Sequence, residues 1–102
     1  MTMHISDVLR NHNPAISFEF FPPKTAKSSE ELFTTISALM PLKPAYVSVT
    51  YGAGGTTRER THDLVVKLRR ETDLTIVSHL TCVGSGREEI QQILAKYLDN
   101  DI

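Results

Sequence analysis

Glu19 is the residue whose type and position point most directly to chemistry. It lies within the strand-like segment Ile16–Phe21, although glutamate disfavours strands and its charge is costly to bury without a partner. Pro22 and Pro23 end this segment just beyond Glu19, since neither can donate a hydrogen bond to a neighbouring strand. Glu19 is therefore expected near the carboxyl end of a strand, where a catalytic acid of an α/β enzyme would lie. The alternative is an exposed carboxylate, or one paired with Lys24 or an arginine.

Two further stretches carry polar groups within or directly after the later strand patterns. Residues 51–57 read Tyr-Gly-Ala-Gly-Gly-Thr-Thr and precede a helical pattern, where backbone N–H groups and the helix dipole can receive a phosphate. This segment lacks the P-loop lysine and the dinucleotide-binding glycine spacing, so a plain connecting loop is the alternative. His79 lies within the third strand pattern and is interpreted as a proton carrier, a contact to a cofactor, or a hydrogen-bonded interior histidine.

The remaining histidines and the single cysteine do not form a metal-binding pattern. His4, His12 and His62 are scattered and have no ligand spacing with Cys82, so no metal site is expected. A lone cysteine cannot form an internal disulfide and suits a reducing compartment, which makes the cytoplasm the expected location. One helical segment carries four arginines that are interpreted as a solvated face with ion pairs, namely Arg58, Arg60, Arg69 and Arg70.

Strand and helix patterns alternate along the chain, after a short N-terminal helix. Strands are predicted over Ile16–Phe21, Tyr46–Tyr51 and Thr75–Val83, which begin about 30 residues apart, the length of a strand plus a crossover helix. A helical period follows each strand. Each helix is predicted to begin with a capping box, in the pairs Ser28 with Glu31, Thr56 with Glu59, and Ser85 with Glu88. This order indicates an α/β protein with parallel strands, either a doubly wound sheet or part of a (β/α)₈ barrel.

Alternation within the strands separates an apolar face from a polar one. Glu19 shares its face with Ser17 and Phe21, and Ser48 and Thr50 alternate with valines in the second strand. In the third strand, His79 and Thr81 alternate with Ser78, Leu80 and Cys82. The apolar faces are expected to pack under helices, and the polar faces are expected to open onto a site.

Composition and length exclude several classes of protein. The chain has 102 residues, and its hydrophobic content of 40% is that of an ordinary globular domain, so residues 1–102 are interpreted as part of one domain without an internal boundary. The net charge of −1 disfavours nucleic-acid binding. No apolar run approaches the roughly 20 residues of a membrane span, and the first residues do not resemble a secretory signal. Because a complete barrel needs about 250 residues, the chain is expected to be the N-terminal part of a longer enzyme.

Three motifs together resemble the methylenetetrahydrofolate reductase family. They are Ser-Phe-Glu-Phe-Phe-Pro-Pro-Lys-Thr over residues 17–25, Val-Ser-Val-Thr-Tyr-Gly-Ala over 47–53, and His-Leu-Thr-Cys over 79–82. All three occur in the family's order with comparable spacing. The resemblance implies a (β/α)₈ barrel that binds flavin adenine dinucleotide (FAD), takes hydride from NADH or NADPH, and reduces 5,10-methylenetetrahydrofolate to 5-methyltetrahydrofolate.

The resemblance also implies roles for individual residues. Glu19 matches the catalytic acid, which would protonate the folate amine as the five-membered ring opens to an electrophilic iminium. Thr50 matches a position near the nicotinamide, while Tyr51, Ala53 and His79 match flavin contacts. The full-length protein is expected to form a homo-oligomer. The isolated chain is expected to be inactive, because the family's remaining flavin and folate contacts lie in later strands.

Two other classes of function stay open on the sequence alone. A different barrel or doubly wound enzyme could use a strand-end glutamate and a glycine segment on a phosphorylated substrate, and it would bind phosphate without yellow colour. A non-catalytic piece could instead associate with another chain through an open sheet edge. The motif around Glu19 favours the reductase over both.

Overall fold

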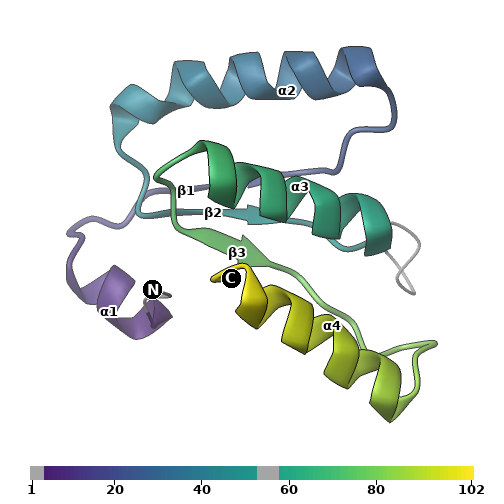
Figure 1. The fold of residues 1–102 in the computed structure, drawn as a ribbon. Coiled ribbons are helices and arrows are strands. Elements are labelled where there is room, and N and C mark those ends of the chain that lie inside the picture. Colours follow the sequence, from purple (N-terminus) through teal and green to yellow (C-terminus); the bar gives the residue numbers. More distant parts are fainter. Residues whose placement is uncertain (1–3, 53–57) are drawn as a thin grey trace.

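A computed structural model describes residues 4–52 and 58–102 of the chain. They form an α/β unit with a three-stranded parallel sheet in the order β1-β2-β3 (Figure 1). The strands are β1 (Ser17–Phe20), β2 (Tyr46–Val49) and β3 (Ile76–Ser78). The helices are α1 (Ile5–Arg10), α2 (Ala26–Leu39), α3 (Arg58–Glu71) and α4 (Arg87–Asp99), with a short 3₁₀ turn η1 (Met40–Leu42) after α2. The predicted α/β class, parallel strands and short N-terminal helix are confirmed.

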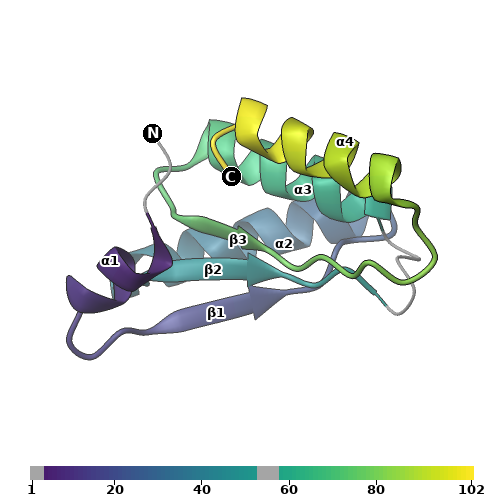
Figure 2. The same ribbon diagram turned by 90° about the horizontal axis from the view of Figure 1, so that it is seen from below.

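The helices α2 and α3 cover one side of the sheet. Figure 2 looks onto the opposite side, where the strands stand in front of α2 and α3 and where α1 lies beside the amino ends of the strands. The helix α4 runs alongside β3 and extends the helical layer (Figures 1 and 2). The sheet therefore has a helix-covered side and, at its carboxyl ends, an open side.

The core lies between the sheet and the helices. The helix α3 buries residues spaced as one face of a 3.6-residue period, namely Thr61, Leu64, Val65 and Leu68. They pack in one cluster with strand residues of the same side, Phe20, Val47, Val49 and Ile76. In α2 only Ile36 is buried, and other apolar residues of that helix are partly buried against the cluster.

The strand register decides which residues of neighbouring strands lie side by side on each face of the sheet. Phe20 pairs with Val49, which pairs with Ser78, and this row faces the helices. One residue earlier in each strand, Glu19 pairs with Ser48. Because successive side chains of a strand point to opposite faces, Glu19 and Ser48 lie on the open side. The predicted separation of the two faces holds for these strands.

The third strand is shorter than predicted. It ends at Ser78, although the β-rich pattern continues to Val83. The backbone N–H of His79 still donates to the carbonyl of Val49 at 3.0 Å, but Val49 is the last residue of β2. Residues beyond His79 have no regular ladder to join, and the chain turns at Gly84, whose φ is 78°.

Two of the predicted helix starts are wrong in detail. Helix α2 begins earlier than expected, because Thr25 is the N-cap and forms a capping box with Ser28 rather than Ser28 with Glu31. Helix α4 has Gly86 as its N-cap and no side-chain cap, since the hydroxyl of Ser85 accepts a hydrogen bond from an arginine instead. The predicted pair of Thr56 with Glu59 involves a residue outside the described part of the chain.

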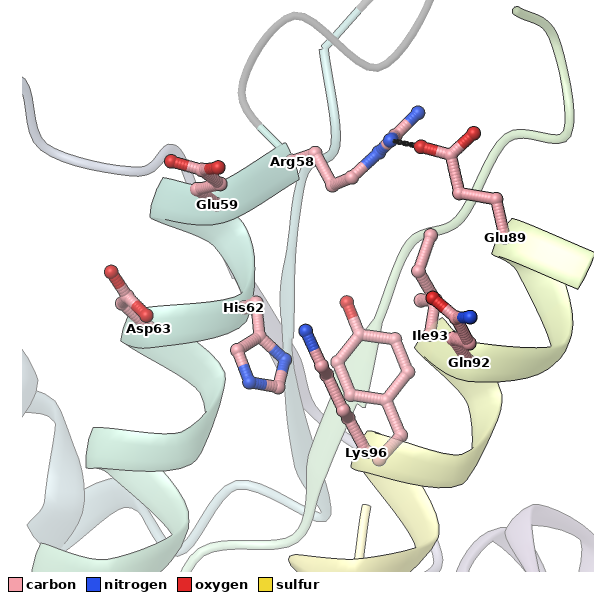
Figure 3. Close-up of a pocket in the computed structure, with 9 residues that line it drawn as sticks. Arg58, Glu59, His62, Asp63, Glu89, Gln92, Ile93 and Lys96 are labelled. Carbon is pink, nitrogen blue, oxygen red and sulfur yellow. Dashed lines mark hydrogen bonds and ion pairs between the residues drawn. The ribbon is translucent and has the colours of Figure 1, made fainter. Parts of the chain in front are cut away.

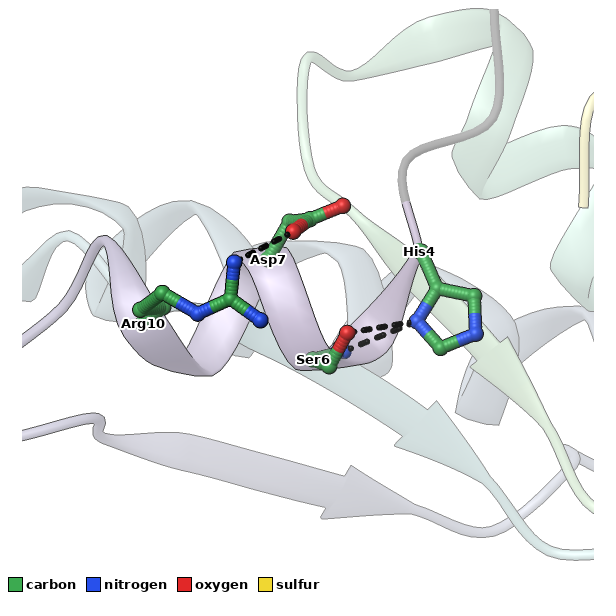
Figure 4. Close-up of polar contacts among 4 residues, drawn as sticks. All are labelled: His4, Ser6, Asp7 and Arg10. Atoms are coloured by element: carbon green, nitrogen blue, oxygen red, sulfur yellow. Dashed lines mark hydrogen bonds and ion pairs between the residues drawn. The ribbon is translucent and has the colours of Figure 1, made fainter.

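The short helix α1 is held by local polar contacts and one buried side chain. His4 is its N-cap, and its Nδ1 accepts a hydrogen bond from the backbone N–H of Ser6 at 3.2 Å (Figure 4). Arg10 pairs with Asp7 one turn earlier at 3.1 Å. Val8 is buried and anchors the helix.

Helix α4 buries only some of its apolar residues. Ile93 and Tyr97 are buried, whereas Leu94 and Leu98 are 47% and 71% exposed. These two leucines line an apolar groove of about 430 Å³ beside β3. Among the described residues, no helix combines the length and apolar character that crossing a membrane would require.

Candidate active site

The carboxylate of Glu19 is the centre of a polar group at the carboxyl ends of the strands. The hydroxyl of Ser48 donates to Glu19 Oε1 at 3.2 Å, and His79 Nε2 lies 3.1 Å from the same oxygen. Each of the three residues follows or belongs to a different strand. The predicted alternatives for Glu19, a pairing with Lys24 or an arginine, do not occur among the described residues, where its partners are Ser48 and His79.

The parallel sheet accounts for this grouping. Glu19 and Ser48 are register partners on neighbouring strands, so their side chains stand next to each other on one face. His79 is held one residue beyond β3 by the hydrogen bond from its N–H to Val49. The two outer residues therefore reach over β2 toward each other.

The three side chains differ in their exposure to solvent, and the two oxygens of the Glu19 carboxylate differ in their contacts. The side chains of Glu19 and His79 are 52% and 43% exposed, whereas Ser48 is buried. Both contacts are made to Oε1, and within residues 4–52 and 58–102 the second oxygen, Oε2, has no hydrogen-bond partner. A carboxyl group held at one oxygen and free at the other can exchange a proton with a bound molecule.

The other predicted site residues lie at the end of β2. Thr50 is half-buried, and its backbone is fixed because its N–H donates to Phe20 at 3.0 Å and its carbonyl accepts from the Thr61 hydroxyl at 2.7 Å. Tyr51 is buried, and its hydroxyl accepts a hydrogen bond from Arg58 of α3. The side chain of Tyr51 therefore points into the helical layer, which leaves its backbone as the part that could meet a ligand. Ala53 lies outside the described residues.

Arg58 forms an ion pair, as the sequence predicted for the arginines of this helix, but its side chain is only partly solvated and bonds to three residues. Its side chain is 28% exposed and bonds to Tyr51, Ser85 and Glu89. The hydrogen bond to the Tyr51 hydroxyl raises the pKa of Arg58 above its ordinary value, and the negative charge of Glu89 adds to the effect. The signal in the sequence that could have indicated these contacts is the position of Arg58 at the start of a helix, shortly after the end of a strand.

A second polar contact forms on the helix-covered side. The Ser78 hydroxyl donates to the Tyr97 hydroxyl at 2.9 Å, and the His62 ring lies 5.4 Å from the Tyr97 ring. Burial raises the pKa of Tyr97, and the hydrogen bond from Ser78 partly opposes this shift. Ser78 and His79 are neighbours in sequence, yet they serve opposite sides of the sheet.

A cleft of about 400 Å³ between α3 and α4 lies on this helix-covered side (Figure 3). The ion pair of Arg58 with Glu89 closes one end, and His62 and Lys96 lie further along it. Tyr97 also lines the cleft. Neither Glu19 nor His79 lines the cleft. In the described part of the chain, no three histidine, cysteine or acidic side chains are grouped closely enough to hold a metal ion.

Comparison with known proteins identifies one family. The family model described as methylenetetrahydrofolate reductase matches residues 4–102. The 5,10-methylenetetrahydrofolate reductase of Pectobacterium carotovorum is 42% identical over 87 residues, and that of Escherichia coli K12 is 41% identical over 87 residues. In both cases the match covers 85% of this chain and 29% of the relative.

More distant relatives are also similar. Methylenetetrahydrofolate reductase (NADH) 1 of Arabidopsis thaliana is 34% identical over 98 residues, which cover 96% of this chain and 17% of the plant protein. The chain thus spans less than a third of the length of the bacterial relatives named above.

Proposed function

This chain belongs to the methylenetetrahydrofolate reductase family, and we propose that it builds one wall of an active site that reduces 5,10-methylenetetrahydrofolate to 5-methyltetrahydrofolate. The observation that carries this proposal is the Glu19 carboxylate, held by Ser48 and His79 on the open side of the sheet. In this proposal the three strand-helix units are the first three of a (β/α)₈ barrel. Active sites of such barrels lie at the carboxyl ends of the strands, which is where Glu19 lies.

Glu19 acts as the general acid. Its Oε2 gives a proton to the folate nitrogen, and the bond from this nitrogen to the bridging carbon breaks to leave an electrophilic iminium. Ser48 and His79 bind Oε1, so they orient the carboxyl group without blocking Oε2.

We propose FAD as the cofactor, with NADH or NADPH as the hydride donor. When bound, the flavin supplies hydride to the iminium carbon. The chain's own groups suit such a ligand, since an imidazole and a carboxylate are both about half exposed on the open side, beside the fixed backbone of Thr50. His79, Thr50 and the backbone of Tyr51 line this position, and Ala53 is included on its sequence motif alone.

The isolated chain is proposed to lack catalytic turnover. One sheet face contributes the acid, but its second oxygen and both half-exposed side chains face solvent rather than an enclosing wall. General acids act efficiently where ligands and protein exclude water. Stoichiometric flavin absorbance together with NADH-dependent folate reduction by purified residues 1–102 would refute this statement.

The proposed function is tested in a chimera in which residues 1–102 replace the matching part of the Escherichia coli reductase. Glu19→Gln keeps the shape of the side chain but removes the transferable proton. We expect folate reduction to fall by roughly 10²–10⁴-fold, the usual contribution of a general acid. Reduction of the flavin by NADH should persist, because that half-reaction does not need the proton. Stopped-flow absorbance of the flavin follows each half-reaction separately.

The matched control is Glu30→Gln, which changes an exposed glutamate on α2. It should leave both half-reactions unchanged. If Glu19→Gln slowed both half-reactions equally, Glu19 would be a general structural or binding residue and the acid role would be wrong. A chimera that bound phosphate but no flavin would favour an enzyme acting on a phosphorylated substrate.

A further inference from the structure

Arg58 connects three segments of the chain through one side chain. Its Nε donates to the Tyr51 hydroxyl at 2.9 Å, its Nη1 pairs with the carboxylate of Glu89, and its Nη2 donates to the hydroxyl of Ser85. Tyr51 follows β2, Ser85 lies in the connection between β3 and α4, and Glu89 lies in the first turn of α4. The flat guanidinium fixes the direction of all three bonds, which the single ammonium of a lysine cannot do.

The position of these contacts relates them to the candidate active site. His79 belongs to the same connection as Ser85, between the end of β3 and the start of α4. Tyr51 directly follows Thr50, whose backbone is bonded to β1 and α3. Through Arg58, the segment after β2 is therefore tied to the segment that carries the partner of Glu19.

We propose that Arg58 is a positioning residue that holds residues 50–52, after β2, and residues 79–86, after β3, in the single arrangement that the active site requires. Arg58 does so from the helix-covered side, with its contacts directed to Tyr51, Ser85 and Glu89 rather than to Glu19. We call these three contacts of Arg58 the clasp. The role of Arg58 in the reaction rests on the proposed function above, whereas the existence of the clasp does not depend on that function.

The chain contains a matched control for this residue. At the other end of α3, the guanidinium of Arg70 donates to the Asn100 side chain at 3.1 Å, next to the end of α4. Arg70 therefore also links α3 to the end of α4, and its hydrogen bond goes to Asn100 rather than to residues 50–52 or 79–86. Substitutions at these two arginines separate the effect of the clasp from a general effect of joining the two helices.

The clasp is tested on the chain itself by amide hydrogen exchange, measured by NMR for residues 79–86. Arg58→Met and Arg58→Lys should both speed exchange in this segment about tenfold or more, since hydrogen bonds to a charged group are lost. Arg70→Met should leave these amides unchanged. The proposal is overturned if Arg58→Lys exchanges like the unsubstituted chain, which would mean that charge alone suffices, or if the two methionine variants change these amides equally.

The role in the site is tested by titrating FAD into the chimera. Arg58→Met and Arg58→Lys should weaken FAD binding about tenfold, matching the exchange result, while Arg70→Met should bind as the unsubstituted chimera does. If the unsubstituted chimera fails to bind FAD, the proposed function fails and the exchange experiment still decides the clasp. If FAD binds and the Arg58 variants bind it equally well, the positioning role is wrong.

Discussion

Ser78 and His79 are adjacent in sequence but take part in two different kinds of polar contact. Ser78 points to the helix-covered side and bonds to Tyr97, where burial is strong enough to raise the pKa of the phenol. His79 points to the open side and meets Glu19, where both side chains remain about half exposed. The first contact is enclosed by packed residues, whereas the second is accessible to a ligand.

The difference teaches how one sheet divides its tasks. Polar groups that are enclosed contribute to stability, because leaving one unpaired is costly. Polar groups that are half exposed contribute little to stability but can act on another molecule. Substitutions on the two sides should therefore change the free energy of unfolding by different amounts. The substitutions below test this difference, from the largest expected effect to the smallest.

Removing core volume from the helix-covered side should have the largest effect on stability. Leu68 is fully buried in α3, and Leu68→Ala should lower the free energy of unfolding by about 2–5 kcal/mol through lost burial and a residual cavity. Leu98→Ala is the control, because Leu98 is 71% exposed. This substitution should change the free energy of unfolding by less than about 0.5 kcal/mol. Urea denaturation followed by circular dichroism measures both. Equal losses would contradict the assignment of the core to this side.

Removing the enclosed hydroxyl should have an intermediate effect that depends on pH. Tyr97→Phe leaves the Ser78 hydroxyl without this partner and should cost about 1 kcal/mol at neutral pH. Because burial raises the pKa of Tyr97 in the folded state, the unfolded chain loses the phenolic proton first as the pH rises. The Tyr97 protein should therefore lose stability above about pH 10, the ordinary value for tyrosine, while the phenylalanine variant lacks this contribution.

Denaturation curves at several pH values check this expectation. The difference in free energy of unfolding between the two proteins should narrow as the pH rises past the ordinary tyrosine value. A difference that stays constant across this range would mean that the phenol titrates alike in both states.

Removing the charge on the open side should have the smallest effect on stability. Glu19→Gln should change the free energy of unfolding by less than about 1 kcal/mol, because its contact with His79 is half exposed and screened by water. The same substitution is expected to remove most of the folate half-reaction in the chimera. A large loss of stability would show that the Glu19 contact belongs to the enclosed kind.

Much of this division could be predicted from the sequence. The alternation of apolar and polar residues placed Glu19 and Ser48 on one face, and Pro22 and Pro23 marked the end of the first strand, because both signals are local. The extent of the third strand could not be predicted, since it depends on where β2 stops. The roles that the individual site residues would have in catalysis remain predictions from the motifs.

The clasp at Arg58 could not be predicted from the sequence. Its partners Ser85 and Glu89 lie in a later strand-helix unit, and no local pattern near Arg58 identifies them. Ser85 was expected to cap α4, but its hydroxyl lies within reach of the guanidinium, so a long-range contact replaced a local one. Tertiary packing thus decided between two uses of the same hydroxyl.

The contact of Glu19 with His79 also has a consequence for synthesis on the ribosome. Glu19 emerges with the first strand, but β2 must be inserted beside β1 before β3 can bring His79 into reach. Because a crossover connection separates each pair of parallel strands, this contact requires both connections and all three strands to have emerged. A spectroscopic label that reports on His79 would therefore mark the moment at which β3 of the nascent chain has joined the other two strands.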